Sequence, residues 1–506
     1  MNFLLRKTDD SIKQEFLTIK EKWQRKGGPQ YFLAIPFLFL LIAKLKFQAR
    51  WNEKFGYKYI ILFAFPLILS TGSWSIQHFV DRMFLAWYSP ESIAASLPSG
   101  ILNFAIISIF LGTASYAGTF IAQYFGSRQY EKIGSILWQS IYLAVIAGIF
   151  FLFLIPYAPE MFDFIGHDKD VKDLEIVYFK ILCLGAFPQV AASSIGGFFS
   201  SINKTVTVMW VNIIMTVINI TLDYLLIFNK LNLGVEGIEG AAIATVISVF
   251  CALLMYGVIL LLPKYRRKFN TIQAWKFNPD KFKRLLKFGF PNGVQFFLDM
   301  AGFTFFILFV GKYGKESLAA TSIAFNISTL AFMPMIGFGI TISVLVGQNL
   351  GRNKSSVAER IAYSGFHLTF GYMFLISLAY LFKAEWFIAP FSAFADSGSF
   401  ANIAEITTVL LKFIALYSIF ETMSIIFASA IKGAGDTFFV MVTMIAASTG
   451  ILIIPSYLSI FVFNWSLYVS WIFTVFYVVT IGFTFFIRFR QSKWKSMRVI
   501  ETEEPN

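Results

Sequence analysis

The chain has 506 residues, of which 57% are hydrophobic and 14% are charged, and its mean hydropathy is +0.67. Soluble domains contain about 25% charged residues, so this composition excludes a soluble protein and indicates a polytopic membrane protein. The net charge of +13 does not indicate nucleic-acid binding, because the basic residues gather in loops on one side of the predicted membrane spans.

The hydrophobic residues fall into segments of membrane-spanning length. A helix needs about 20 apolar residues, at a rise of about 1.5 Å each, to cross a bilayer. Cutting the sequence at charged residues and at Gly, Pro and Asn turns leaves roughly twelve such segments. They lie near 58–84, 93–122, 136–156, 174–198, 206–228, 240–262, 285–311, 318–347, 361–382, 405–430, 438–461 and 466–488. We therefore expect an all-α polytopic membrane protein of about 12 transmembrane helices.

A shorter apolar stretch precedes these spans at 31–43. It has 13 residues, contains Pro36, and is flanked by Lys and Arg on both sides. If it crossed the membrane, every later loop would change sides and the charge pattern would fail. We therefore expect an interfacial or a re-entrant helix here.

The charges of the loops predict the orientation of the chain. The segment 263–287 holds nine Lys or Arg residues and one acidic residue, whereas the segment 158–173 is mostly acidic. Loops that should share a side with 263–287 are also basic, and the alternate loops are poorer in Lys and Arg. This positive-inside pattern predicts a multi-pass protein of the cell (inner) membrane with both termini in the cytoplasm.

The two halves of the sequence repeat each other. An offset of 225 places Phe65-Pro66 on Phe290-Pro291, Gly112 on Gly337, Gln123 on Gln348, and Gly126 on Gly351. After the third span the offset becomes 232, which places Lys180 on Lys412, Thr205 on Thr437, and Met209 on Met441. Six spans followed by six in the same orientation predict two bundles, an N-lobe and a C-lobe, around a central cavity and related by an axis along the membrane normal.

This repeat predicts the domain organisation. The expected parts are a cytoplasmic tail with the interfacial helix (1–54), an N-lobe six-helix bundle (55–262), a basic cytoplasmic linker (263–287), a C-lobe six-helix bundle (288–490) and a second cytoplasmic tail (491–506).

Four acidic side chains lie inside the predicted spans: Asp81, Asp223, Asp299 and Glu421. A charge at membrane depth costs about 2.5–3.5 kcal/mol on insertion scales, so such residues usually face a bundle interior and carry function. Counted by helical rise from cytoplasmic Lys residues, Asp81 and Asp223 lie about 35 and 28 Å deep, and Asp299 and Glu421 about 18 and 16 Å. Each half therefore holds one pair, at positions that the repeat does not relate.

The first pair has polar neighbours. Asn219 and Asp223 lie on one face of the fifth span, and Thr245 in the sixth span adds a hydroxyl. Carboxylate, amide and hydroxyl oxygens suit a hard monovalent cation, and two close carboxylates equally suit a shared proton. Arg82, next to Asp81, either neutralises that carboxylate or points away from it.

Several segments resemble the multidrug and toxic compound extrusion (MATE) transporters, within the larger group of multidrug, oligosaccharidyl-lipid and polysaccharide exporters. They are FPLILSTGSWSIQHFVDRMFLAWYSPESIAAS, AQYFGSRQ, NIIMTVINITLDYLLIFNKLNLGVEGIEGAAIAT, FGFPNGVQFFLDMAGF, VGQNLGRNK and FETMSIIFASAIKGAGDT. The resemblance covers about 55–490. The chain departs from the family pattern at Ala86, where the family has Gly, and at Lys432-Gly433, where the family has Arg-Gly.

The resemblance implies a function and two sites. In the family, residues that match Asp81, Asn219 and Asp223 form an N-lobe ion or proton site, and those that match Asp299 and Glu421 form a C-lobe cation site in one subgroup. Na⁺ is a possible ligand of either set. The implied activity is export of amphipathic, often cationic organic compounds in exchange for Na⁺ or H⁺. We expect a monomer in the lipid bilayer, with small organic substrates, no nucleic-acid partner and no cofactor beyond the coupling ion.

Two alternative functions agree less well with the sequence. A lipid-linked oligosaccharide flippase of the same superfamily tends to line its cavity with Arg and Lys, whereas here the central charges are acidic and Arg82 is the only cation expected at depth. An intramembrane enzyme needs a nucleophile–base pair or a metal cluster, and the sequence has no HExxH, GxSxG, paired His or P-loop motif. We therefore expect no enzymatic activity and no catalytic residues.

Overall fold

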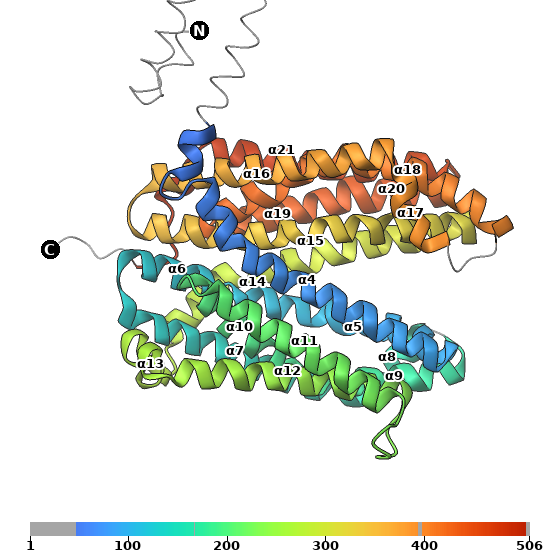
Figure 1. Ribbon diagram of the computed structural model, residues 1–506, viewed down its shortest axis with the longest axis horizontal. Helices are drawn as coiled ribbons and strands as arrows, with labels where there is room; N and C mark the ends of the chain where they lie inside the picture. The colour runs from blue at the N-terminus through green and yellow to red at the C-terminus, as the bar shows by residue number, and fades with distance from the viewer. Residues whose placement is uncertain (1–46, 166, 393–396, 502–506) are drawn as a thin grey trace, which may run out of the picture. The chain divides into compact units, whose positions relative to one another are not determined.

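The computed structural model describes residues 47–165, 167–392 and 397–501. The predicted interfacial or re-entrant helix at 31–43 lies outside these residues. The chain divides into two compact units, Met1–Leu62 and Phe63–Asn506, and the arrangement described below concerns the larger unit alone (Figure 1).

The described residues form helices and contain no β-strand. The α-helices are α4 (Tyr57–Tyr88), α5 (Pro90–Ser115), α6 (Ala117–Ser127), α7 (Ile133–Leu154), α8 (Ala158–Ile165), α9 (Lys169–Leu184), α10 (Ala186–Ser201), α11 (Thr205–Ile227), α12 (Gly237–Leu261), α13 (Pro263–Phe269), α14 (Pro279–Val310), α15 (Lys315–Gly351), α16 (Ser355–Phe382), α17 (Ala384–Ser392), α18 (Ser397–Ala434), α19 (Thr437–Ala447), α20 (Ile454–Tyr457) and α21 (Leu467–Arg490).

The helices of the described residues include 11 that are long and apolar enough to cross a membrane. The count becomes 12 if α9 and α10, which are bent by 46° at Gly185, form one broken span. The predicted all-α fold of about twelve transmembrane helices is confirmed. The bend was not predicted, and its physical reason is Pro188, which has no N–H to donate to the carbonyl of Leu184 one turn earlier.

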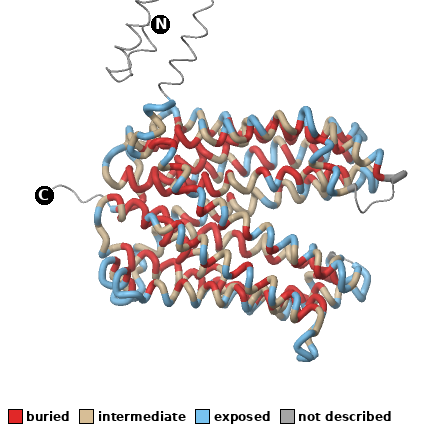
Figure 2. Tube along the Cα trace, in the orientation of Figure 1, coloured by how far each residue is buried: buried red, intermediate tan, exposed pale blue. Residues whose placement is uncertain are grey.

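The helices of the larger unit form two bundles (Figure 1). In the first, α5, α7 and α9–α12 pack on one another, and in the second, α15, α16, α18 and α21 do so. Helix α14 packs on α5 of the first bundle and on α19 of the second. Figure 2 shows buried residues inside each bundle and, at the end that carries α6 and α13, also between the bundles. The predicted boundaries of the lobes, linker and tails stay predictions.

The first helix of each repeat crosses to the opposite bundle. A Cβ atom on Gly112 of α5 would lie 2.6 Å from Cα of Gly293 in α14, and one on Gly337 of α15 would lie 2.9 Å from the main-chain nitrogen of Ile68 in α4. The offset of 225 relates Gly112 to Gly337 and Ile68 to Gly293, so the two contacts are equivalent. Glycine is needed at both crossings because a side chain would collide with the backbone of the crossing helix.

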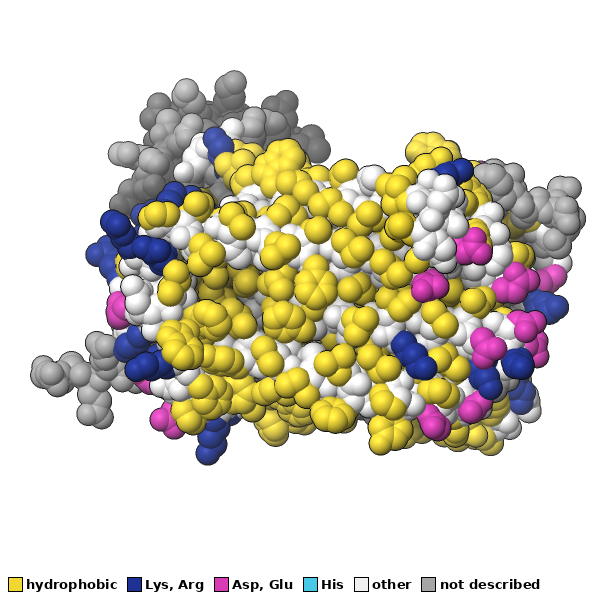
Figure 3. Space-filling view, turned by 90° about the horizontal axis from the view of Figure 1, so that it is seen from below, with side chains coloured by type: hydrophobic (Ala, Val, Ile, Leu, Met, Phe, Trp, Pro, Cys, Tyr) yellow, Lys and Arg dark blue, Asp and Glu magenta, His cyan; other side chains and the backbone are white. Residues whose placement is uncertain are grey.

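Charged residues gather at the two ends of the larger unit. Figure 3 shows an apolar middle, with Lys and Arg at the end that carries α13, and Asp and Glu mostly at the opposite end. The last turn of α13 contains Arg266, Arg267 and Lys268. We call the end that carries α6 and α13 the basic end.

The two bundles are joined at the basic end by equivalent hydrogen bonds. The side-chain amide of Gln123 in α6 donates to the main-chain oxygen of Gly433 in α18 (2.9 Å). The amide of Gln348 in α15 donates to the main-chain oxygen of Ser201 in α10 (2.8 Å). The repeat relates Gln123 to Gln348 and Ser201 to Gly433, so both halves contribute the same closing contact.

Residues 491–501, which we call the C-terminal strap, lie against this junction. The Trp494 and Val499 side chains are 1% and 0% exposed, and the Val499 N–H donates to the side-chain oxygen of Gln123 (2.9 Å). Ion pairs also join the strap to α16 and α14, through Lys495 with Glu359 (2.9 Å) and Glu501 with Arg284 (3.7 Å). The strap therefore contacts helices of both bundles where they meet.

Candidate functional site

The first predicted carboxylate pair is brought together near the ends of two helices. Asp81 lies two turns before the end of α4, and Asp223 lies one turn before the end of α11. Their side chains are buried, with 8% and 0% of each residue exposed. The charge of Asp81 acts on Asp223, so the two carboxyl groups lie within electrostatic range of each other.

Asn219, one turn before Asp223 in α11, completes a buried polar cluster. Its amide nitrogen and oxygen, both carboxyl oxygens of Asp223 and Oδ1 of Asp81 are buried, and none of these atoms has a hydrogen-bond partner among the described residues. Burying a polar group without a partner costs roughly 2–7 kcal/mol, and burying an unpaired charge costs far more. This arrangement favours protonation of the pair or binding of a cation.

Apolar packing holds the cluster. Phe84, Leu85 and Ile227 belong to one buried cluster that also contains Tyr178 of α9 and Ala241 of α12. The charges of Asp81 and Asp223 both act on the Tyr178 phenol. Sequence reasoning missed Tyr178, because it has no motif of its own and reaches the carboxyl groups only through the packing of α9 against α5 and α12.

The sequence also predicts roles near this pair for Arg82 on α4 and Thr245 on α12. Arg82 is exposed, and none of the ion pairs in the described part of the chain joins it to Asp81. Arg82 therefore does not neutralise the carboxylate by direct contact. Thr245 lies half-buried on α12, and no described contact joins its hydroxyl to Asp81 or Asp223, so its part in the site stays a prediction.

The second predicted pair lies on α14 and α18. Asp299 and Glu421 are both half-buried, and the charge of Asp299 acts on Glu421. Oε2 of Glu421 is buried and has no hydrogen-bond partner among the described residues. The charges of both residues act on the phenol of Tyr477 in α21.

A lysine and a glutamine extend this second set. The Lys432 ammonium in α18 donates to Oε1 of Gln295 in α14 (2.9 Å), and Nε2 of Gln295 donates to Oδ2 of Asp299 (3.3 Å). The ammonium has only donors and the carboxylate only acceptors, so this orientation of the amide satisfies both. Lys432 corrects the expectation that Arg82 is the only cation at depth, because the Lys432 side chain reaches inward from the end of its helix.

Sequence reasoning missed these contacts for different reasons. Gln295 lies four residues before Asp299 on one helix, a spacing that places both on the same face and could have identified it. Lys432 departs from the family pattern, but that departure alone predicts no contact. Its contact with Gln295 spans 137 residues of sequence, and no local pattern predicts it.

Each carboxyl set contains two acidic side chains. No group of three or more His, Cys, Asp or Glu side chains that could hold a metal ion occurs in the part of the chain that the structure describes. Two buried carboxyl groups can share a proton or supply oxygen ligands to a monovalent cation.

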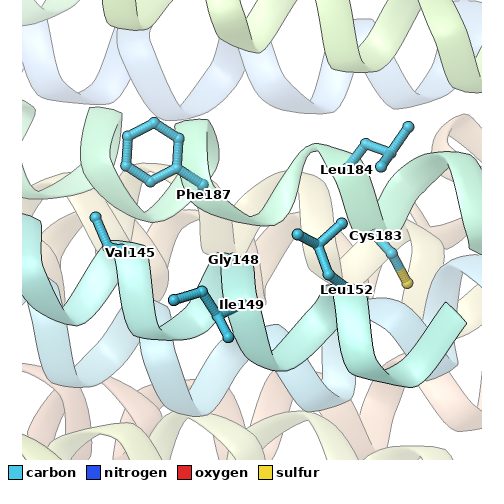
Figure 4. A pocket seen from close by; sticks show the side chains of 7 residues that line it. All are labelled: Val145, Gly148, Ile149, Leu152, Cys183, Leu184 and Phe187. Carbon is cyan, nitrogen blue, oxygen red and sulfur yellow. The ribbon is translucent and has the colours of Figure 1, made fainter.

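An apolar groove lies elsewhere, between α7 and the bend that joins α9 to α10 (Figure 4). Its volume is about 320 Å³, and it is lined by Val145, Gly148, Ile149, Leu152, Cys183, Leu184 and Phe187. None of the six predicted site residues lines this groove, and it contains no charged side chain. It therefore adds nothing to the ion chemistry of the carboxyl sets.

Comparisons with known proteins agree with the two-bundle arrangement. The MatE family model matches residues 66–225 and 291–458, one match in each half. The protein named "Probable multidrug resistance protein NorM" of Thermotoga maritima is 25% identical over 431 residues, which cover 84% of this chain and 90% of that protein. A protein of the same name from Neisseria meningitidis serogroup B is 25% identical over 411 residues, 81% of this chain and 88% of its own.

Solved structures of similar fold are known. A MOP superfamily transporter from Pyrococcus furiosus superposes with a TM-score of 0.79 at 19% identity, over 87% of this chain and 97% of that chain. A multidrug resistance MATE family transporter in an outward-facing conformation gives a TM-score of 0.78 at 19% identity, over the same shares of the two chains. At this level of identity the likeness establishes the fold.

Proposed function

Because this chain belongs to the MatE family, whose matched relatives are transporters and not enzymes, we propose that it is a cation-coupled secondary antiporter. It exports amphipathic, often cationic organic compounds by alternating access, and Na⁺ or H⁺ is the coupling ion. Its NorM relatives carry the name of multidrug resistance proteins, which supports this substrate class. No other cofactor is required.

The observation that carries the proposal is the buried, unpartnered cluster of Asp81, Asn219 and Asp223. Two carboxylates without a donor are unfavourable inside a membrane protein, and a bound Na⁺ or H⁺ relieves that cost. An ion can drive a conformational change only if it binds the two conformations with different affinity. The pair lies between α4 and α11, and α4 also crosses to the opposite bundle at Ile68, so ion binding and bundle movement share one helix.

The charge distribution supports an orientation. The basic end faces the cytoplasm by the positive-inside rule, so both termini are cytoplasmic and the protein lies in the cell membrane. Since the bundles are joined at the basic end, the cytoplasmic side of the junction is closed in this conformation. The coupling ion then reaches the carboxyl sets from outside, and its binding favours the inward-facing state that loads substrate.

The site chemistry favours cationic substrates over lipid-linked pyrophosphates. The two carboxyl sets contain four acidic groups, Asp81, Asp223, Asp299 and Glu421, and one ammonium, that of Lys432. This excess of negative charge attracts organic cations and repels pyrophosphate. Both sets lie within one chain, so a monomer is sufficient.

Transport by purified protein in liposomes tests the proposal. Efflux of ethidium and a small panel of other cationic dyes is measured under an inward Na⁺ gradient and, separately, an inward H⁺ gradient. We expect one gradient to drive dye transport in the unmutated protein and to fail with an Asp81→Asn/Asp223→Asn variant in matched liposomes. Dye movement that is independent of both gradients would contradict cation coupling. Unchanged transport by the double variant would contradict a coupling site at Asp81 and Asp223.

A further inference from the structure

Lys432 and the two polar residues linked to it have no counterparts at the repeat-related positions of the first half. The offset of 232 relates Lys432 to Ser200, and the offset of 225 relates Asp299 to Trp74 and Gln295 to Ser70. The second half therefore carries an ammonium, an amide and a carboxylate where the first half has two hydroxyls and an indole. Three linked polar residues that depart together from the repeat indicate a function of the second half alone.

The side chain of Lys432 is tied to a carboxylate without pairing with it directly. Gln295 lies between the two groups, at 2.9 Å from the ammonium and 3.3 Å from the carboxylate of Asp299. None of the described ion pairs involves Lys432, yet its charge acts on Asp299. The Lys432 ammonium is thus separated by one amide group from the carboxyl set that a mobile cation would occupy.

The main chain at Lys432 is tied to the opposite bundle. The Tyr116 hydroxyl donates to the Lys432 main-chain oxygen (2.6 Å), and the Gln123 amide donates to that of Gly433 (2.9 Å). A Cβ atom on Gly433 would lie 2.6 Å from the main-chain oxygen of Ser343 in α15, so this turn has little room to move independently. One residue therefore contacts the carboxyl set with its side chain and the other bundle with its backbone.

We propose that Lys432 is a positioning residue. Through its ammonium, binding of the coupling ion at Asp299 and Glu421 is coupled to opening of the bundle junction at the basic end. A mobile cation beside Asp299 repels the fixed ammonium. The repulsion displaces the turn that holds the Lys432 and Gly433 carbonyls, and the hydrogen bonds from Tyr116 and Gln123 weaken. Like charges at close range inside a protein repel more strongly than in water, so the cation binds less tightly while the junction is closed. By reciprocity, its binding favours the open junction.

This inference rests on the proposed function, and the test separates the two. Spin labels at Glu131 and Lys354, exposed positions on opposite bundles at the basic end, report the junction by electron–electron double resonance in a background where Cys183 and Cys251 are replaced by Ala. The distance distribution is measured in lipid with and without saturating Na⁺ at fixed pH, and at high and low pH without Na⁺. It is measured first in this labelled parent and then with Asp81→Asn/Asp223→Asn, which leaves Asp299 and Glu421 as the remaining carboxyl set.

In the labelled parent we expect the coupling ion to raise the ratio of open to closed junction well above about fivefold. In the second protein, where only Asp299 and Glu421 respond, we expect a rise of about fivefold, the lower end of measured allosteric couplings, which without the first pair does not sustain dye transport. Lys432→Met, added to the second protein, should reduce that change to less than about twofold, and Lys432→Arg should restore it. Calorimetry should show that the Lys432→Met protein binds the ion at least as tightly as the same protein with Lys432. A protein whose ion site had collapsed would not bind the ion. Lys432→Gln, which keeps a polar head without the charge, replaces the methionine variant if that protein is not stably produced.

Each contrary result has a separate meaning. An unchanged response after Lys432→Met overturns the role of Lys432 and leaves the proposed function intact. The role of Lys432 is also overturned, and the proposed function kept, if the ion changes the junction in the labelled parent but not in the Asp81→Asn/Asp223→Asn protein. Absence of any response to Na⁺ or H⁺ in the parent contradicts cation coupling itself, and the role of Lys432 with it.

Discussion

Gly126 lies so close to Gln348 that a Cβ atom on the glycine would come within 2.0 Å of the Gln348 main-chain oxygen. The repeat-related pair has the same relationship, since a Cβ atom on Gly351 would lie 2.1 Å from the main-chain oxygen of Gln123. Backbones of the two bundles thus touch directly at the basic end. No rotamer change can relieve a side chain there, because the obstacle is main chain.

We therefore expect Gly126→Ala to open the junction at the basic end. Overpacking a close contact costs about 1–3 kcal/mol, which corresponds to a change of about 5- to 150-fold in the ratio of open to closed protein. The distance between labels at positions 131 and 354 measures this ratio. Gly257→Ala is the matched control, because a Cβ atom on Gly257 would meet no atom within 4 Å. An unchanged distance distribution in the Gly126 variant would show that the bundles do not close by backbone contact.

Neutralising the first carboxyl pair should uncouple transport. Asp81→Asn or Asp223→Asn keeps the side-chain shape but removes the change in charge that ion binding produces, so we expect dye efflux from cells to fall at least about tenfold. Glu239→Gln, which changes an exposed carboxylate of α12, is the control. Drug accumulation in cells without their own major efflux pumps provides the measurement. Equal loss in all three variants would indicate a general defect in folding or insertion.

Neutralising the second pair should weaken the response to Na⁺. With Asp299→Asn or Glu421→Gln, we expect the Na⁺ concentration for half-maximal dye transport in liposomes to rise at least about tenfold, because one ligand charge is lost. Glu405→Gln changes an exposed glutamate of the same helix α18 and should leave this value unchanged. Na⁺ titrations that coincide for the unmutated protein and both site variants would rule out a cation site at this pair.

The C-terminal strap should detach when its anchor is removed. The Trp494 ring stacks on Phe489 with ring centroids 4.9 Å apart, and its indole N–H donates to the Phe489 main-chain oxygen (2.9 Å). Trp→Ala at a buried site costs about 3–5 kcal/mol, so Trp494→Ala should speed tryptic cleavage after Lys493 and Lys495 at least about tenfold. Trp386→Ala, at a residue that is 70% exposed, should not change the cleavage rate. Equal resistance of both variants would show that other contacts hold the strap.

The sequence was sufficient for the spans and for the acidic residues within them. Hydropathy identifies the membrane spans, and a carboxyl group inside a span usually faces the bundle interior, so Asp81 and Asp223 were identifiable from the sequence alone. Spacing on one helix added Asn219, because four residues return to the same face. The repeat predicted two bundles, and the crossings of Gly112 with Gly293 and of Gly337 with Ile68 follow that repeat.

The contacts that depend on packing between distant segments were beyond prediction. Lys432 has the sequence context of a loop cation near a helix end, and only the arrival of α14 beside α18 places Gln295 within its reach. The sequence of the strap has no hydrophobic periodicity and therefore predicts a charged tail. Its Trp494 and Val499 become buried because α6, α16 and α18 together form a surface at the basic end, and no local rule describes such a surface.

The strap also bears on how the protein is made. Its hydrogen bond from Val499 to Gln123 joins residues 376 apart in sequence. At a synthesis rate of about 5–20 residues per second, Gln123 leaves the ribosome roughly 20–75 s before Val499. The first bundle therefore inserts and packs while its partner for this contact is still untranslated, and the junction acquires its last fastening only when translation of residue 499 is complete. A nascent chain that pauses within the second bundle therefore lacks the hydrogen bond from Val499 to Gln123 at the junction.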